Sequence, residues 1–342
     1  MNKIKVGIAG FGVVGRKRYS YLKNNRSFQV VGICEKEKFD YPLKRKNISI
    51  FQNYSQLLDL DLDGIFVCLS NDMAAEVTIA ALNKNIHVFC EKPPAINISE
   101  IKRIIRVKEK KRHLKLMYGF NHRFHDSVRD AIKIINSNKF GKIINLKGTY
   151  GKSKLITFDQ TNWRTKRNIA GGGILLDQGI HLIDLIRLFG GDVIEIKSFI
   201  LNNFWKHDVE DNAYAIMKHK NNIISMIHSS ATQWKHKFIL EINLSKGSLI
   251  LEGILSSSKS YGEEKLTIIK YDPKDKYGKF KTRVVHYEND PSWHSEIKNF
   301  AKAINKDSII SSDINDAYKT FKLIFDIYCE DSKWKKRFNI KN

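Results

Sequence analysis

The sequence is poor in cysteine, has no long apolar run, and carries far fewer acidic than basic side chains. Its 342 residues include four cysteines, and none of them forms a C-x-x-C pair. This spacing argues against a structural zinc site or a disulfide framework and favours a reduced, cytoplasmic chain without a metal. No apolar stretch approaches the length of about 18 residues that a membrane-spanning helix needs. The N-terminal apolar run contains three glycines and does not fit a signal peptide.

The shortage of acidic residues leaves 59 Lys and Arg against 36 Asp and Glu, a formal net charge of +23. So basic a chain raises the question of a nucleic acid or an anionic membrane surface as partner. However, the excess divides about evenly between residues 1–120 and the rest, and no basic arm, tail or helix-turn-helix pattern stands out. We therefore expect a solvated basic surface, with no nucleic-acid or membrane partner.

The length exceeds what a single core usually covers, and the sequence pattern changes after Phe120. Residues 1–120 alternate β-rich apolar runs with helical patterns, which predicts a doubly wound parallel sheet. In residues 121–342, strand-like runs follow one another through short links, which predicts an α+β domain with a large, mostly antiparallel sheet. The predicted fold class is α/β, with domains at 1–120 and 121–342. Ser99 is the predicted N-cap of a helix over 99–111.

A glycine-rich loop, Gly10-Phe11-Gly12-Val13-Val14-Gly15, follows the first predicted strand directly and opens a helix. Gly10 permits a tight turn, Gly12 lets a pyrophosphate approach the backbone, and Gly15 lets the helix pack against the strand. This context predicts a dinucleotide-binding loop.

Glu35 lies 20 residues beyond Gly15, at the end of the second predicted strand. Its carboxylate can accept hydrogen bonds from ribose hydroxyls, which favours NAD as the cofactor. Lys36 and Lys38 beside it could pair with a 2′-phosphate, so NADP is the alternative.

Two further segments follow predicted strands, Leu69-Ser70-Asn71 and Glu91-Lys92-Pro93-Pro94. Residues just past the carboxyl ends of parallel strands line the ligand crevice of an open sheet. The prolines end the strand and stiffen the turn, which predicts that Lys92 faces this crevice.

A third segment begins with Gly171-Gly172-Gly173 and continues as an apolar helical pattern from Ile174. Asp177, His181 and Asp184 fall at i, i+4 and i+7 of this pattern, which predicts one polar stripe on a buried helix. A histidine oriented by a carboxylate one turn away suits general acid–base catalysis on a hydroxyl proton. The alternative is a structural Asp–His pair.

Taken in order, these motifs resemble the Gfo/Idh/MocA family, the glucose-fructose oxidoreductase and inositol dehydrogenase-like enzymes, over essentially the whole chain. Gly119-Phe120-Asn121-His122-Arg123-Phe124 and Asn162-Trp163-Arg164 also carry the resemblance. It implies a Rossmann domain followed by a domain with an open-faced sheet, often used for contacts in a homo-dimer or homo-tetramer. Ser70 and Ala74 depart from the family pattern on the cofactor side.

The resemblance implies that Lys92, Asp177 and His181 are the catalytic residues. The predicted cofactor-binding residues are Gly10, Phe11, Gly12, Val13, Val14, Gly15, Glu35, Lys36, Ser70, Asn71, Glu91, Lys92, Asn121 and Arg164. The predicted substrate-binding residues are Lys92, Arg123, Trp163, Asp177, Gln178 and His181. Whether His181 or Lys92 is the immediate base is left open.

The predicted function is an NAD(P)-dependent oxidoreductase that transfers hydride between a nicotinamide and a ring hydroxyl or ketone of a sugar, sugar nucleotide or cyclitol. The alternatives are a redox-neutral sugar enzyme that retains its NAD and a non-catalytic dinucleotide or sugar sensor on the same fold. A cluster of basic residues before the triple glycine favours a sugar nucleotide or another anionic sugar over the alternative of a solvated loop. Its members are Lys152, Lys154, Arg164, Lys166 and Arg167.

Overall fold

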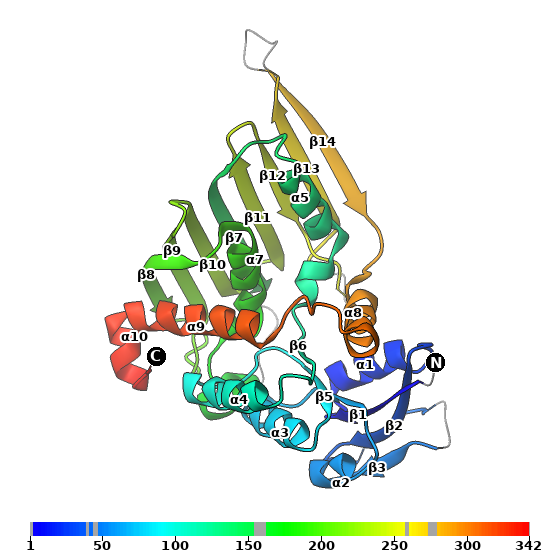
Figure 1. The fold of residues 1–342 in the computed structure, drawn as a ribbon. Helices are drawn as coiled ribbons and strands as arrows, with labels where there is room; N and C mark the ends of the chain where they lie inside the picture. The colour runs from blue at the N-terminus through cyan, green and yellow to red at the C-terminus, as the bar shows by residue number, and fades with distance from the viewer. Residues whose placement is uncertain are drawn as a thin grey trace. The chain divides into compact units, whose positions relative to one another are not determined.

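The computed structural model describes residues 3–38, 41–43, 47–153, 162–256, 260–272 and 279–341. The chain divides into two compact units (Figure 1). The first unit comprises Met1–Phe120, Asn168–Gly171 and Trp293–Lys319, and the second comprises Asn121–Arg167, Gly172–Ser292 and Thr320–Asn342. The first boundary falls after Phe120, where the sequence pattern changes. The sequence did not indicate the two later returns of the chain to the first unit.

The first unit is built on a parallel sheet of six strands in the order β3-β2-β1-β4-β5-β6. The order reverses between β1 and β4, and such a switch point is where ligands bind in open α/β sheets. The doubly wound parallel sheet predicted from the sequence is confirmed. The strands are β1 (Ile4–Ala9), β2 (Phe28–Cys34), β3 (Ser49–Phe51), β4 (Gly64–Val67), β5 (His87–Cys90) and β6 (Leu116–Tyr118). The helices between them are α1 (Val13–Leu22), α2 (Tyr54–Leu58), α3 (Asn71–Asn83) and α4 (Ile98–Lys110).

Helix α4 begins one residue earlier than predicted, and Ser99 is not its N-cap. Asn97 is the N-cap, because its side-chain oxygen accepts a hydrogen bond from the Glu100 backbone N–H at 2.9 Å. Asparagine and serine are comparably good N-caps, so composition alone could not decide between them. Ile98 is the first residue of α4, and its side chain is buried.

A buried arginine on α1 ties three distant segments of the first unit together. The Arg18 guanidinium donates to Glu91 Oε1 at 2.6 Å and to Glu296 Oε2 at 2.7 Å, and its carbon lies 4.1 Å from the Trp293 ring centroid. Glu296 and Trp293 belong to α8 (Ser292–Lys306). Burial by itself would lower the pKa of Arg18, but the two carboxylates outweigh it and hold the pKa above its ordinary value.

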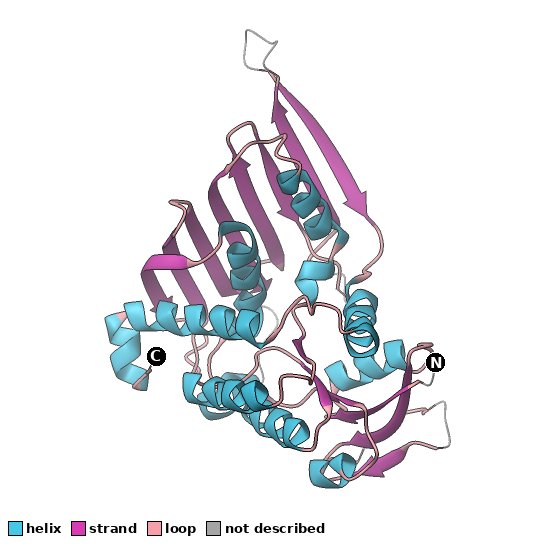
Figure 2. Cartoon of the chain, viewed as in Figure 1, coloured by secondary structure: helices cyan, strands magenta, loops and turns pink. Residues whose placement is uncertain are grey.

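The second unit is built on an eight-stranded sheet in the order β14-β13-β12-β11-β7-β10-β9-β8. Its strands are magenta in Figure 2. Only β7 and β10 pair in parallel, so the prediction of a mostly antiparallel sheet is confirmed. The strands are β7 (Ile143–Ser153), β8 (Val193–Leu201), β9 (Asn212–His219), β10 (Ile224–Gln233), β11 (Lys237–Leu244), β12 (Gly247–Glu252), β13 (Glu264–Tyr271) and β14 (Phe280–Tyr287).

Helices cover one face of this large sheet. Helix α5 (Asp126–Asn136) lies on β12 and β13, and α7 (Ile180–Gly190) lies on β7 and β10 (Figure 1). Strand β9 alternates buried and exposed residues, with Tyr214 and Ile216 exposed on the opposite face. The remaining helices are the short α6 (Arg167–Ala170), α9 (Ile314–Glu330) and α10 (Ser332–Phe338).

The segment Arg167–Gly190 is long and apolar enough to cross a membrane, which the sequence reading did not identify. Most of its apolar window is buried inside the structure, as expected for a core helix. Its apolar composition is therefore explained by packing against the large sheet.

The buried charge cluster of the first unit gives a stability prediction. Replacing Glu296 with alanine leaves Arg18 buried with half of its compensation, and losing one partner of a buried pair costs about 3–5 kcal/mol. We expect a loss of that size in urea unfolding. Asp61→Ala is the matched control, since it removes an exposed ion pair with Lys5 and should leave the midpoint unchanged. Equal effects of the two variants would show that Arg18 is not a structural clamp.

Candidate functional site

The glycine-rich loop has the backbone geometry that a dinucleotide requires. Gly10 adopts φ +89°, and a Cβ there would collide with the Cys68 carbonyl oxygen. A Cβ at Gly15 would collide with the Gly10 carbonyl oxygen, because α1 packs tightly against β1. At Gly12, by contrast, no described heavy atom lies within 4 Å of the Cβ position. The open space at Gly12, at the start of α1, fits a pyrophosphate on a helix N-terminus.

Glu35 lies against this loop, as the sequence spacing predicts. Its Oε2 accepts a hydrogen bond from the Phe11 backbone N–H at 2.6 Å, and its Oε1 accepts one from the Lys36 N–H at 2.9 Å. The side chain of Val13 beside the loop is 86% exposed. The described geometry thus brings the predicted ribose-binding carboxylate to the predicted pyrophosphate-binding loop. Val14 lies in the first turn of α1.

The two residues after β4 have local partners. Ser70 is the N-cap residue of α3, and its hydroxyl donates to Asp72 Oδ1 at 2.6 Å. Asn71 is buried, and its Nδ2 donates to the Ala170 carbonyl at 2.7 Å. Asn71 therefore holds the Asn168–Gly171 segment within the first unit.

Glu91 and Lys92 follow the carboxyl end of β5, as predicted. The carboxylate of Glu91 accepts from Arg18, so it has a structural partner inside the first unit. Gly119 permits this arrangement, because a Cβ there would lie 2.6 Å from Glu91 Oε2. Lys92 is half-buried, and its peptide bond to Pro93 is cis.

In the second unit, Glu210 anchors the segment that carries Asp177 and His181. Its buried carboxylate accepts hydrogen bonds from the backbone N–H groups of Gly173 and Leu175, at 2.8 and 3.0 Å. It also accepts one from the Tyr328 hydroxyl at 2.6 Å. Burial raises the pKa of Glu210, while Arg167 and these hydrogen bonds oppose the rise.

The helical segment after this anchor is not the plain α-helix predicted from Ile174. Leu175–Gly179 forms a π-helical turn, and α7 starts only at Ile180. A π-turn adds a residue to the turn and rotates the residues before it relative to those after it. The plain α-helix from Ile174, on which the predicted stripe of Asp177, His181 and Asp184 rests, is therefore corrected for its first turn.

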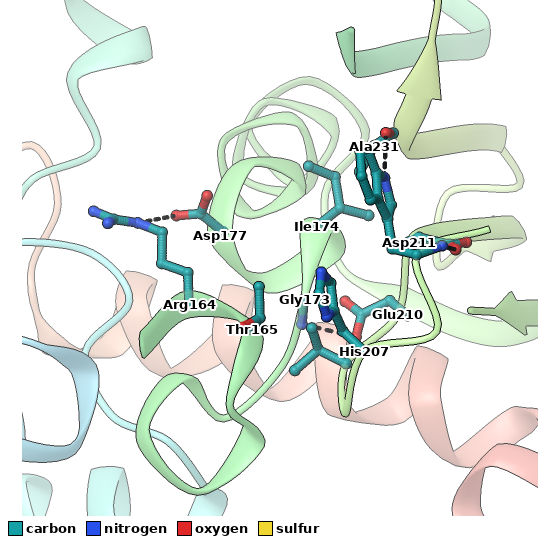
Figure 3. Close-up of a pocket in the computed structure, with 11 residues that line it drawn as sticks. Arg164, Thr165, Gly173, Ile174, Asp177, His207, Glu210, Asp211 and Ala231 are labelled. Carbon is teal, nitrogen blue, oxygen red and sulfur yellow. Dashed lines mark hydrogen bonds and ion pairs between the residues drawn. The ribbon is translucent and has the colours of Figure 1, made fainter. Parts of the chain in front are cut away.

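The two aspartates of the predicted stripe have different cationic partners. Asp177 accepts from Lys152 Nζ at 3.2 Å and pairs with Arg164 Nε at 3.9 Å (Figure 3). Asp184 is buried and accepts two hydrogen bonds from Arg123, at 2.7 and 2.6 Å. Arg123, predicted to bind substrate, is thus bound to a buried carboxylate.

His181 lies against a second histidine that sequence reasoning did not single out. The rings of His181 and His122 stack with centroids 3.9 Å apart and planes 9° from parallel. His122 Nδ1 lies 3.1 Å from Asn121 Oδ1, and its Nε2 lies 3.1 Å from the Tyr150 hydroxyl. Asn121, predicted to bind cofactor, therefore has an interaction inside the second unit. The position of His122 inside the Gly119–Phe124 motif was the available sequence signal.

Gln178 and two tyrosines extend the polar surroundings of Asp177. The Tyr261 hydroxyl donates to Gln178 Oε1 at 2.6 Å, and the Tyr261 and Tyr150 rings meet edge to face. Burial, and to a smaller extent the charge of Asp177, raise the pKa of both tyrosines. Both hydroxyls are therefore neutral donors at physiological pH.

A pocket lies beside Asp177, with about 350 Å³ of empty space, part of it open to solvent. Figure 3 shows Arg164 and Asp177 on one side of it and His207 with Glu210 on the other. Trp205 also lines it, held by a hydrogen bond from its indole N–H to the Ala231 carbonyl at 2.8 Å. The loop that carries Trp205 and His207 has no periodic pattern, so no sequence signal indicated this wall.

The basic residues before the triple glycine differ in their partners and in their exposure to solvent. Arg164 lies over Trp163, with its guanidinium carbon 4.4 Å from a ring centroid, and both Arg164 and Lys152 approach Asp177. Arg167 lies 4.0 Å from Glu210, and Lys166 is exposed. Lys154 lies outside the described residues. Within the described ranges, no three His, Cys, Asp or Glu side chains group as a metal site requires.

Comparison with known proteins agrees with this geometry. Residues 4–120 match the model of an oxidoreductase family with an NAD-binding Rossmann fold, and residues 128–250 match the model of the GFO/IDH/MocA C-terminal domain.

Among curated relatives, glucose-6-phosphate 3-dehydrogenase of Bacillus subtilis is 30% identical over 56% of this chain and 55% of its own length. Myo-inositol 2-dehydrogenase of Thermotoga maritima is 23% identical over 73% of this chain and 76% of its own length. The match to the first of these spans about half the length of that relative.

A solved structure of levoglucosan dehydrogenase in complex with NADH superposes with a TM-score of 0.83. It is 21% identical and covers 97% of this chain and 98% of its own, which shows a shared fold. The two family models match in sequence order and together span most of the chain, so this protein belongs to the Gfo/Idh/MocA family of oxidoreductases with an NAD-binding Rossmann domain.

Proposed function

We propose that this protein is an NAD-dependent dehydrogenase or reductase that acts on a ring hydroxyl or ketone of a sugar or cyclitol. The observation that carries the proposal is a histidine, His181, within a buried polar cluster of a chain whose other unit has a dinucleotide-binding loop. The relatives named for glucose-6-phosphate and myo-inositol support the substrate class.

The described loop fits the cofactor. Open space at Gly12 leaves room for the pyrophosphate, the α1 N-terminus offers backbone N–H groups to it, and Glu35 lies where a ribose hydroxyl would donate. NAD, when bound, supplies the hydride acceptor. The protein then has to bind the sugar, orient one carbinol and remove its hydroxyl proton.

Proton handling falls to Lys92 and His181, which belong to different units. A neutral imidazole takes a hydroxyl proton at physiological pH, since its ordinary pKa is close to neutral. Asp177 lies four residues before His181 and belongs to the same proposed catalytic set. Lys92 hydrogen-bonds the reacting oxygen and stabilises negative charge on it.

We assign the substrate to the anionic sugars, either a sugar phosphate or a sugar nucleotide. Lys152 and Arg164 both approach Asp177, so two cations share this carboxylate. An ammonium and a guanidinium are good partners for a phosphate oxygen, and Lys166 adds a third cation nearby in sequence. A panel of neutral sugars, cyclitols, sugar phosphates and sugar nucleotides, assayed by reduced-cofactor absorbance, tests this choice.

The role of His181 predicts a large loss of turnover on substitution. His181→Ala removes the proton acceptor, so kcat should fall by about 10²–10⁴-fold, the usual contribution of general base catalysis. The dissociation constant for NADH, measured by fluorescence titration, should stay unchanged, because the dinucleotide loop lies in the first unit. Turnover close to that of the unmodified protein would refute the assignment.

The position of Glu35 predicts the cofactor preference. Glu35→Ala removes a charge-assisted hydrogen-bond acceptor for the ribose, so NAD should bind about 10–100-fold more weakly. NADP binding should change less, since its 2′-phosphate gains nothing from a carboxylate. Glu37→Ala, which removes an exposed carboxylate two residues away, is the matched control and should leave NAD affinity within two-fold, about the scatter of such surface changes. An unchanged affinity in Glu35→Ala would contradict the ribose contact.

The open face of the large sheet predicts self-association into a homo-dimer or homo-tetramer. Phe199 pairs with Tyr214 across β8 and β9, and Ile216 pairs with Met226 across β9 and β10, so exposed apolar side chains form rows over three strands. Monomers rarely expose apolar patches of this kind.

A charge placed in these rows should therefore dissociate the assembly. We expect Ile216→Glu to reduce the mass measured by analytical ultracentrifugation to that of one chain, because a carboxylate cannot be buried unpaired in an interface. Ile309→Glu, on an exposed isoleucine of the first unit, is the matched control and should leave the mass unchanged. A single-chain mass for the unmodified protein would refute the proposal.

A further inference from the structure

Two buried histidines from distant parts of the second unit stack face to face. His122 lies on a short 3-10 helix, Asn121–Phe124, and His181 lies at the start of α7. The ring centroids are 3.9 Å apart, and the exposed fractions of the two residues are 5% and 6%. Moving two imidazole rings out of water is costly unless their nitrogens have hydrogen-bond partners.

The stack is held in place by the ion pair next to it. Arg123 follows His122 in sequence, Asp184 lies three residues after His181, and the two side chains share a pair of short hydrogen bonds. Such a bidentate pair fixes both distance and orientation. The Thr320 hydroxyl donates to Asp184 Oδ1 at 3.2 Å and adds a further constraint. The 3-10 helix and α7 are therefore fastened together at the position of the two rings.

A chain of hydrogen bonds sets the protonation state of His122. The Asn121 side-chain oxygen can only accept, so His122 Nδ1 carries a proton and donates to it. Asn121 Nδ2 donates in turn to the Ser292 hydroxyl at 3.1 Å, and Ser292 donates to Asp290 Oδ1 at 2.5 Å. His122 Nε2 then accepts from the Tyr150 hydroxyl in the neutral ring.

The charged groups on both sides of the pair are held in ion pairs, so the hydrogen bonds of His122, which engage both nitrogens of its neutral ring, leave His181 as the ring that takes up the proton. On the His122 side, His125 lies with its ring 5.5 Å from that of His122 and is bound to Glu264 at 2.7 Å. Asp184 is neutralised by Arg123. On the His181 side, Asp177 faces Lys152 and Arg164. Two imidazolium rings in parallel contact would repel each other, so at most one of the two rings is an imidazolium at a time.

We propose that His122 is a positioning residue for His181. Its neutral ring fixes the orientation of the His181 ring, and its π face stabilises the positive charge that His181 acquires on taking the substrate's hydroxyl proton. The inference rests on the proposed function for its catalytic consequence, while the stack itself is a property of the protein without substrate.

The first test measures the His181 ring directly in the protein without substrate. Histidine ring signals followed by NMR over pH 5–9 give the pKa of His181 in the unmodified protein, in His122→Leu and in His122→Phe. A neutral π face favours the protonated form, so its loss in His122→Leu should lower the pKa of His181 by about 0.5–1 unit. His122→Phe retains a ring and should restore most of the difference. An unchanged pKa in His122→Leu would overturn the proposal.

The second test follows turnover over the same pH range. A base must be neutral to act, so the acid limb of the kcat profile should move to lower pH in His122→Leu, in the same direction as the NMR value. We expect kcat at pH 7 to fall about 10-fold, since a poorly held base loses orientation, with KM for the sugar and the NADH dissociation constant nearly unchanged. A rise in KM with kcat unchanged would place His122 in substrate binding and would also overturn the proposal.

His219 provides the matched control. It is fully buried and has both ring nitrogens in hydrogen bonds, to the Gly191 carbonyl at 3.0 Å and the Ser225 hydroxyl at 2.8 Å. His219→Leu should lower the thermal midpoint but leave the pH profile and the His181 signal in place. If it moves them as far as His122→Leu does, the effect is one of general stability and the proposal fails. Absence of turnover in the unmodified protein with every sugar would refute the proposed function alone, because the NMR test stands without it.

Discussion

In the first unit, the Arg18 guanidinium is buried between the carboxylates of Glu91 and Glu296, and the placement of the cofactor-side residues depends on it. Arg18 lies on the helix that the glycine-rich loop opens, and Glu91 directly precedes Lys92 at the end of β5. Fastening these segments together keeps Lys92 at a fixed place relative to the dinucleotide loop. Gly119 is part of the same arrangement, since any side chain there would displace Glu91. Glu91 thus compensates the buried charge of Arg18, and Gly119 leaves room for Glu91, although the two residues come from separate motifs.

Buried carboxylates also fasten separate segments together in the second unit. Glu210 satisfies backbone N–H groups at the start of the segment that carries Asp177, and Asp184 holds the 3-10 helix against α7. Burying these groups is costly by itself, and each is compensated by an arginine or by several donors. The π-turn lies between these two anchors. Glu210 fixes the segment before this turn and Asp184 fixes the helix after it, and the turn holds one more residue than an α-helical turn.

The sequence predicted most of what depends on neighbouring residues and little of what depends on distant partners. Gly10, Gly12 and Gly15 lie in one turn, and their roles follow from backbone geometry that any such turn shares. Asp184 was predicted to belong to a polar stripe and Glu91 to bind cofactor, and both predictions came from motifs read locally. Their actual partners, Arg123 and Arg18, are 61 and 73 residues away, and no local pattern reveals them.

The histidine pair is another contact between distant segments, and it was missed for the same physical reason. His122 and His181 belong to two motifs that were each read locally, and only the fold stacks their rings. The π-turn at Leu175–Gly179 likewise could not be foreseen, because an apolar run predicts a plain α-helix. Long-range pairing and local departures from helical period are what a single sequence shows least.

The excess of basic residues that gives the net charge of +23 is also found next to the pocket. Lys152 and Arg164 both approach one carboxylate, Asp177, which lines the pocket. Arg123 and Arg167, by contrast, pair with the buried carboxylates Asp184 and Glu210. A basic residue in the site therefore attracts an anionic substrate only when no buried acid already holds it. By this criterion Lys152 and Arg164, which share the partly exposed Asp177, are the cations that we propose for binding an anionic sugar.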